Sequence, residues 1–159
     1  MMSKRTLGLI SFLLIAILAL FGSQILIQVV TAGGTVTVTP KLSFTDLQPS
    51  QITTSESTYR ATLTATGSNF YNVIEIVWSW SGPDSGSETW KKGDSNWNNY
   101  VAITSDTSMT LRPMVLYQET GTQTKTWTWT VTLKDSTGAT ASRQFTVTYQ
   151  PSFTKPDLR

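Results

Sequence analysis

The pattern of apolar and polar residues divides the chain into two parts. From Leu7 to Val30 the sequence is predominantly apolar and carries no charge, whereas from Thr35 onward short apolar sets alternate with polar residues. A long apolar run predicts a helix that enters or crosses a membrane, and alternation with a period of two predicts β-strands. Gly33-Gly34 separates the two patterns, so we expect one N-terminal helix followed by an all-β body.

The body contains about six or seven strand-like segments separated by polar turns. Thr124–Lys134 is the clearest, because Trp127, Trp129, Val131 and Leu133 all fall on one face and threonines fall on the other. Short alternating strands joined by turns predict an immunoglobulin-like β-sandwich of about seven strands. The other segments of this kind are Thr35–Thr39, Tyr59–Thr66, Val73–Trp80, Met109–Tyr117 and Ala139–Gln150.

The alternation also predicts which side chains are buried and where the chain turns. In Val73–Trp80 we expect Ile74, Ile76, Trp78 and Trp80 to point inward. Pro113 lacks the amide N–H that a central strand needs, which suggests an edge or a bulge at that position. The polar tetrapeptide at residues 135–138, Asp-Ser-Thr-Gly, is typical of a hairpin turn.

These patterns define four regions of the chain. Residues 1–32 form a basic head and a hydrophobic helix, which is a membrane anchor or a signal. Residues 33–41 form a linker with the first strand, residues 42–150 the sandwich, and residues 151–159 a C-terminal tail.

The N-terminal apolar segment is long enough to cross a membrane. A helix over Leu7–Val30 would be about 36 Å long, against a hydrocarbon layer of about 30 Å. Lys4 and Arg5 precede it, and positive charge is retained on the cytoplasmic side. We therefore expect the body to lie outside the membrane.

Three interpretations of this segment remain open. The first is a retained anchor, which its length favours. The second is a secretory signal with Leu7–Phe21 as its apolar region and cleavage after Val30-Thr31-Ala32; the polar residues Gln24 and Gln28 favour this one. In the third, the segment resembles the leader and helix of an archaeal-type pilin, cut near Gly8, although Leu7 stands where such leaders usually carry a charge.

Gln24 and Gln28 are the candidate contact residues of the expected helix. They are four positions apart and would share one helix face. Either both lie near the membrane interface, or their amides hydrogen-bond to a neighbouring helix within the membrane.

Composition excludes several classes of function. The chain has no Cys and no His, which removes disulfides and the commonest metal ligands and nucleophile–base pairs. Of the 12 basic residues, Lys4 and Arg5 lie in the head, and the remaining ten are balanced by ten acidic ones. A body without a basic excess lacks the charge of a nucleic-acid binder.

No catalytic, cofactor or metal site is predicted for the body. Asp84, Glu88 and Asp94 could supply oxygen ligands for calcium, but their spacing matches no calcium loop, so a solvated loop is expected there. No pair of carboxylates indicates acid–base catalysis. Trp90 and Trp97 lie in the polar stretch 82–99 and are the candidate exposed aromatics for stacking on a sugar or anchoring a partner; alternatively they fold back to cover a sandwich edge.

Two passages resemble known extracellular modules. Ala61–Phe70, ATLTATGSNF, resembles the early strand and turn of IPT/TIG immunoglobulin-like domains. Trp129–Tyr149, WTVTLKDSTGATASRQFTVTY, resembles the closing hairpin of PKD-type domains, although the tryptophan–aspartate–glycine signature of that family is absent. These resemblances imply an extracellular structural or binding module.

We therefore expect a non-enzymatic, membrane-anchored protein whose body lies outside the cytoplasm, or a secreted one if the N-terminal segment is cleaved. The expected role is that of a structural or interaction subunit of a cell-surface assembly. A pilin-like filament is one such assembly. Its expected partners are the membrane and other protein subunits, bound through the helix and the sheet edges. The alternatives are an accessory single-span subunit of a larger membrane complex, and a secreted carbohydrate-binding or adhesion module.

Overall fold

The computed structural model describes residues 27–31, 34–38 and 40–152. The chain divides into two compact units, Met1–Pro40 and Lys41–Arg159. Within the described residues, no helix is long and apolar enough to cross a membrane.

The described part of the first unit is a two-stranded antiparallel sheet. It consists of β1 (Ile27–Thr31) and β2 (Gly34–Val38), and Thr31 pairs with Gly34. The β2 strand confirms the strand expected from Thr35 onward. The four β-branched residues of β1 favour an extended chain.

The β1 strand corrects the expectation of a helix that continues to residue 30. Residues 27–31 are extended, so Gln28 lies in a strand opposite Thr37 and not in a helix. Gln24 and the rest of the expected helix lie outside the described residues.

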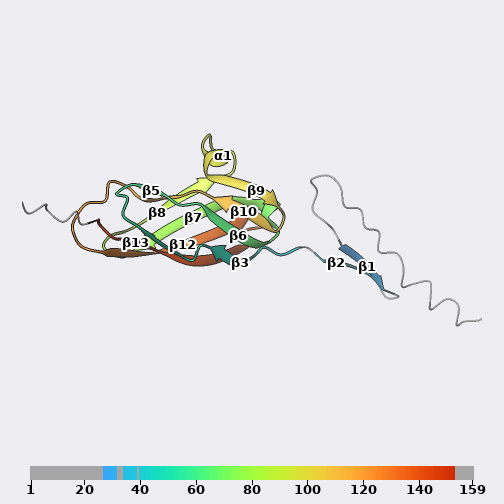
Figure 1. The fold of residues 1–159 in the computed structure, drawn as a ribbon. Coiled ribbons are helices and arrows are strands. Elements are labelled where there is room, and N and C mark those ends of the chain that lie inside the picture. Colours follow the sequence, from blue (N-terminus) through green and yellow to red (C-terminus); the bar gives the residue numbers. More distant parts are fainter. Residues whose placement is uncertain (1–26, 32–33, 39, 153–159) are drawn as a thin grey trace, which may run out of the picture. The chain divides into compact units, whose positions relative to one another are not determined.

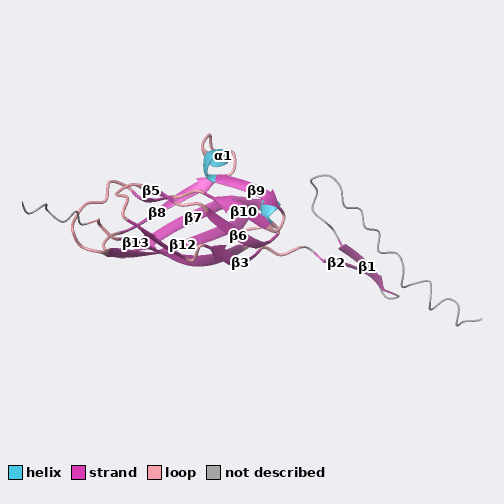
Figure 2. Cartoon of the chain, viewed as in Figure 1, coloured by secondary structure: helices cyan, strands magenta, loops and turns pink. Residues whose placement is uncertain are grey.

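The second unit is a sandwich of a four-stranded and a five-stranded sheet (Figures 1 and 2). The four-stranded sheet has the order β3 (Ser43–Gln48), β6 (Leu63–Ser68), β10 (Ser108–Leu111) and β9 (Val101–Ser105). The five-stranded sheet has the order β4 (Gln51–Thr54), β13 (Thr140–Tyr149), β12 (Lys125–Asp135), β7 (Val73–Ser81) and β8 (Ser85–Lys91). The remaining elements are the strand pair β5 (Tyr59–Arg60) and β11 (Met114–Leu116), the 3-10 turn η2 (Phe70–Asn72) and the short helix α1 (Trp97–Tyr100).

The strand order is that of an immunoglobulin-like sandwich. Seven strands define this order, and along the chain they are β3, β6, β7, β9, β10, β12 and β13. The first, second, fourth and fifth (β3, β6, β9 and β10) form one sheet, and the third, sixth and seventh (β7, β12 and β13) form the other. The two additional strands β8 and β4 lie at the edges of the second sheet, and β4 pairs with β13 in parallel. This topology confirms the expected fold class of the body.

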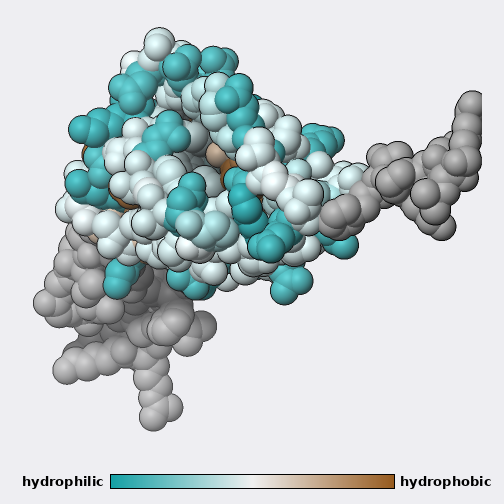
Figure 3. Space-filling model, turned by 90° about the vertical axis from the view of Figure 1, so that its left-hand side faces the viewer, coloured by the Kyte–Doolittle hydropathy of each residue, from teal (hydrophilic) through white to brown (hydrophobic). Residues whose placement is uncertain are grey.

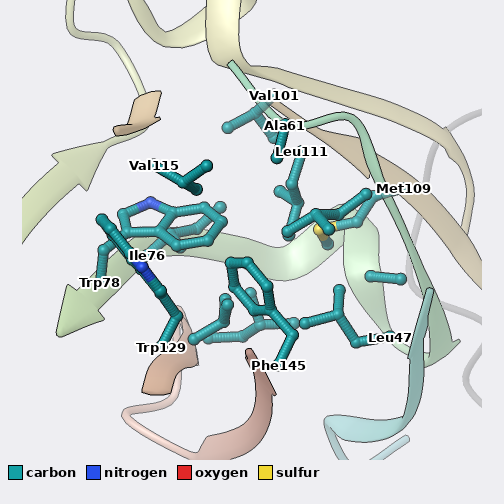
Figure 4. Close-up of a cluster of buried hydrophobic side chains, with 14 of the residues drawn as sticks. Leu47, Ala61, Ile76, Trp78, Val101, Met109, Leu111, Val115, Trp129 and Phe145 are labelled. Atoms are coloured by element: carbon teal, nitrogen blue, oxygen red, sulfur yellow. The ribbon is translucent and has the colours of Figure 1, made fainter. Parts of the chain in front are cut away.

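The core lies between the inward faces of the two sheets (Figure 4). On β12, Trp127, Trp129, Val131 and Leu133 are all buried, as the alternation predicted. From the opposite sheet, strand residues such as Met109 pack against them. Ile76 and Trp78 are also buried, as the pattern predicted. The same holds for the alternating apolar residues of the predicted segments Tyr59–Thr66 and Ala139–Gln150, which are Ala61, Leu63, Ala65, Phe145, Val147 and Tyr149.

One predicted inward residue, Ile74, is instead 39% exposed, while its neighbour Val73 is fully buried. The cause is a register shift at the start of β7, where Glu75 pairs with Lys134 but Val73 pairs with Asp135. A bulge of this kind inserts one residue and reverses the inward and outward faces beyond it.

The turn between β12 and β13 is organised by Asp135, a residue that is only 2% exposed. Its carboxylate accepts hydrogen bonds from the Thr137 amide (2.9 Å), the Thr137 hydroxyl (2.6 Å) and the Ala139 amide (3.0 Å). Burial raises the pKa of Asp135, but these hydrogen bonds to the charged form outweigh it, so the pKa lies below its usual 3.8. The hairpin predicted at residues 135–138 is thus confirmed.

The end of β6, which leads into a second turn, depends on a close approach of two backbones. A Cβ atom on Gly67 would lie 2.1 Å from the Ser43 carbonyl oxygen on β3, so only glycine fits. Asn69 follows in the left-handed conformation, with φ 65°. The carboxylate of Asp106 accepts the amide N–H groups of Asn69 (3.3 Å) and Tyr71 (3.4 Å).

Candidate functional site

The two candidate exposed tryptophans are buried, which corrects that expectation. Trp90 is 7% exposed and Trp97 is 6% exposed. The Trp90 indole stacks on Tyr100 at 4.7 Å and packs against Trp78 at 4.9 Å, while its N–H donates to Glu88 at 2.7 Å. Both side chains belong to the core of the sandwich, so they fold back onto it, as in the alternative interpretation.

The reason lies in a strand that the sequence pattern missed. The polar stretch 82–99 contains β8, and in this strand Trp90 lies opposite Ile76 on the inward face. Because β8 is otherwise composed of Ser, Gly, Glu, Thr and Lys, it lacks the apolar alternation that reveals a strand.

The three acidic residues of this stretch each accept a hydrogen bond within the sandwich. Asp84 accepts the indole N–H of Trp127 at 2.6 Å, Glu88 that of Trp90, and Asp94 the backbone N–H of Lys91 at 2.9 Å. In the part of the chain that the structure describes, no three potential metal-ligating side chains come together.

Two open, shallow hollows lie on the described surface. One is lined by residues 53–55 and 150–152, and the other by Thr130, Ser142, Arg143 and Gln144. Neither brings a carboxylate together with a base.

The β8 edge is the most regular open edge of the sandwich. It has seven residues, contains no proline and pairs with β7 without a register shift. The other three edges are blunted: β3 and the β9–β10 pair contain register shifts at residues 44–46 and 108–109, and β4 has four residues. Bulges and short strands are two of the means that prevent edge pairing. β8 has neither, and its charged residues are Glu88 and Lys91.

The hydrogen bonds of β7 and β8 show which backbone groups of β8 are turned outward. The N–H of Lys92 donates to the Ile74 carbonyl at 2.8 Å, so residue 92 faces β7. The N–H and C=O of one residue point to the same side of a strand, and successive residues alternate. The even residues of β8 therefore bond to β7, and the odd residues point away from it. Lys91 fits this pattern, because both its backbone groups bond to Asp94.

The outer face of the five-stranded sheet forms a second surface beside this edge. It consists of rows of hydroxyl side chains, and several of them bond across strands: Thr126 with Thr148 (3.1 Å) and Thr132 with Ser142 (2.8 Å). An ion pair between Lys134 and Glu75 (3.5 Å) lies at one end of this face. The centre of the face is uncharged and, apart from Val77 opposite Thr132, polar; its polar residues are Ser79, Thr128, Thr130, Thr132, Ser142, Gln144, Thr146 and Thr148.

On the described part of the sandwich, exposed apolar side chains are few and dispersed. In the view of Figure 3 the surface is mostly hydrophilic to neutral, and hydrophobic colour appears only in small recesses. Among the residues that the structure describes, the exposed large apolar ones are Tyr71, Ile74, Met114 and Tyr117. Tyr71 and Ile74 flank the start of β7, whereas Met114 and Tyr117 lie in and after β11, so they form no single large patch.

No protein-family model matches the chain, and no curated protein matches it significantly. Among solved structures, it is similar to murine CRIg at 11% identity and a TM-score of 0.32, covering 71% of this chain and 98% of that one. It is also similar to the ASH / PapD-like domain of human CEP192 at 13% identity and a TM-score of 0.34, covering 69% of this chain and 86% of that one. At this level of similarity, the fold assignment rests on the strand order of the chain itself. An IPT/TIG or PKD type is not confirmed.

Proposed function

We propose that this protein is a non-catalytic structural or interaction subunit of a cell-surface assembly. The observation that carries this proposal is the regular, open β8 edge beside an uncharged hydroxyl face. Surfaces of this type bind other proteins by strand addition and by sheet contacts, whereas small-molecule sites are concave and mostly apolar.

The proposed location rests on the sequence of the N-terminal segment. Lys4 and Arg5 precede the apolar run from Leu7, which would hold the body on the extracytoplasmic side of a membrane. A retained segment gives an anchored subunit, as in a pilin-like filament or as the accessory subunit of a larger complex. A cleaved segment gives a secreted one.

The absence of catalysis is part of this proposal. The buried carboxylate, Asp135, has its pKa lowered and is held by hydrogen bonds in a turn. A general acid or base at neutral pH needs a pKa shifted toward 7. The alternative of carbohydrate binding relied on exposed Trp90 and Trp97, and it loses its support because both side chains are buried.

The test is to purify the full chain from membranes in mild detergent and to measure the mass of the protein part by light scattering. We expect a species larger than one chain, or stoichiometric co-purifying subunits. N-terminal sequencing of the same sample distinguishes an anchor, a signal and a pilin-like leader. A monomer without partners in the detergent extract and in intact membranes would contradict the proposal.

A further inference from the structure

We propose that β8 is a self-association edge: it pairs antiparallel with β8 of a second copy, with Ser87 opposite Ser87 of that copy. This inference rests on the proposed function and specifies the surface and the partner. The result would be one continuous ten-stranded sheet across two copies, related by a two-fold axis at Ser87.

Three residues of β8 supply the backbone groups for this pairing. Ser85, Ser87 and Thr89 are odd-numbered and exposed, and their N–H and C=O groups point away from β7. Lys91 also points outward, but its N–H and C=O are bonded to Asp94. The open part of the edge is therefore Ser85–Thr89.

A self-pairing register must place these three residues opposite one another. With Ser87 at the centre, Ser85 lies opposite Thr89 of the second copy, and every outward backbone group finds a partner. Antiparallel strands form two hydrogen bonds at each such pair, which gives about six bonds across the interface.

The neighbouring registers each fail for a stated reason. A centre at Gly86 places Thr89 opposite Pro83, which has no N–H to donate. A centre at Glu88 places two carboxylates directly opposite each other, which is destabilising. A centre at Thr89 places Ser87 opposite Lys91, whose backbone groups are already bonded.

The side chains suit the Ser87-centred register. Glu88 lies opposite Gly86 of the second copy, so its carboxylate meets no like charge and no bulky side chain. On the other face the opposing side chains are the hydroxyls of Ser85, Ser87 and Thr89. A second copy is thus favoured as the occupant because the strand is complementary to itself in this one register.

Single cysteines test the register directly, since the chain has no Cys of its own. In the full chain, Ser87→Cys should be cross-linked to a covalent dimer by a bismaleimide with a two-carbon spacer, because opposed Cα atoms lie about 5.5 Å apart. Thr89→Cys should remain monomeric, because the two residues would be offset by four positions, or about 13 Å. Equal cross-linking of both variants, or none of Ser87→Cys, would overturn the proposal.

Proline provides a matched pair of variants. Thr89→Pro removes an outward N–H on β8 and leaves the β7 ladder intact, so the full chain should lose the dimer and remain folded by circular dichroism. Thr53→Pro is the control, because Thr53 is an exposed, outward-directed threonine on β4, the opposite edge of the same sheet. We expect this variant to dimerise normally.

A failure of the β8 self-association can be distinguished from a failure of the proposed function. If Thr89→Pro assembles as well as the unchanged chain, the β8 edge is wrong and assembly occurs through another surface. If the unchanged chain is a monomer without partners, the proposed function is wrong as well.

Discussion

Replacing Gly86 by alanine tests the packing that supports the β8 edge. A Cβ atom at this position would lie 2.3 Å from Cζ2 of Trp80 and 2.8 Å from its Cε2. Trp80 has little room to retreat, because its other side stacks on Trp129 at 4.9 Å. Behind Trp129 lies Phe145, at 6.1 Å. The four residues form a continuous stack from the sheet edge into the core.

The expected loss of stability follows from three terms. Overpacking a well-packed site costs roughly 1–3 kcal/mol. If Trp80 swings outward, the lost stacking costs roughly 0.5–1.5 kcal/mol. Replacing a glycine within a strand by alanine stabilises the folded state by roughly 0.5–1 kcal/mol, which offsets part of this loss. At the midpoints of these ranges, the net expectation for Gly86→Ala is a loss of about 2 kcal/mol.

The measurement is urea unfolding of residues 41–159, the unit that holds the whole core, followed by circular dichroism. The control is the same substitution in a Trp80→Ala background, where the clash is gone. There Gly86→Ala should stabilise the fold by about 0.5 kcal/mol. An effect of the same sign and size in both backgrounds would refute the stacking argument, because the two sites would then be energetically independent.

Two further predictions concern the turns. Asp135→Ala should cost about 2 kcal/mol at neutral pH, because the carboxylate accepts three hydrogen bonds. Since the folded pKa of Asp135 is lowered, its contribution to stability is present above the unfolded pKa and is lost as the pH falls through the folded pKa. The difference in unfolding free energy between variant and parent, measured in urea, should therefore shrink below about pH 4. A difference that does not change with pH would contradict this. Gly67→Ala should cost about 3 kcal/mol or more, since the new Cβ meets the Ser43 carbonyl and β3 must separate from β6. Urea unfolding measures this loss of stability. Ser68→Ala is the adjacent control and is expected to lose less stability.

The predictable part of the fold was the part with strict alternation. The inward faces of β12 and β13 were predictable because large apolar residues recur there at every second position. Ile74 was predicted on the wrong face because a bulge at the start of β7 depends on pairing with β12, which no local pattern encodes. Residues 27–31 were assigned to a helix because an apolar run does not distinguish a β-branched strand from the end of a helix.

The candidate site was less predictable. The β8 strand is polar because it lies at a sheet edge, so its sequence resembles a loop. Trp90 and Trp97 looked exposed within that loop, whereas the structure buries both of them. The orientation of the β8 backbone groups depends on the pairing of Lys92 with Ile74, a contact that only the three-dimensional structure provides. The two acceptors of the indole N–H groups, Asp84 and Glu88, were equally hidden, because the sequence does not show that they lie beside Trp127 and Trp90.

The parallel pairing of β4 with β13 determines how the body would respond to mechanical force. The chain enters the sandwich at β3, beside the start of β13, and β13 ends at Tyr149, beside Thr54 at the opposite end. A pull between these two ends slides residues 51–54 along residues 146–149, so the hydrogen bonds between them are loaded together in shear rather than broken one at a time. Such a geometry raises the force needed for unfolding, and a body tethered at one end and drawn from the other would transmit tension along its length before it yields.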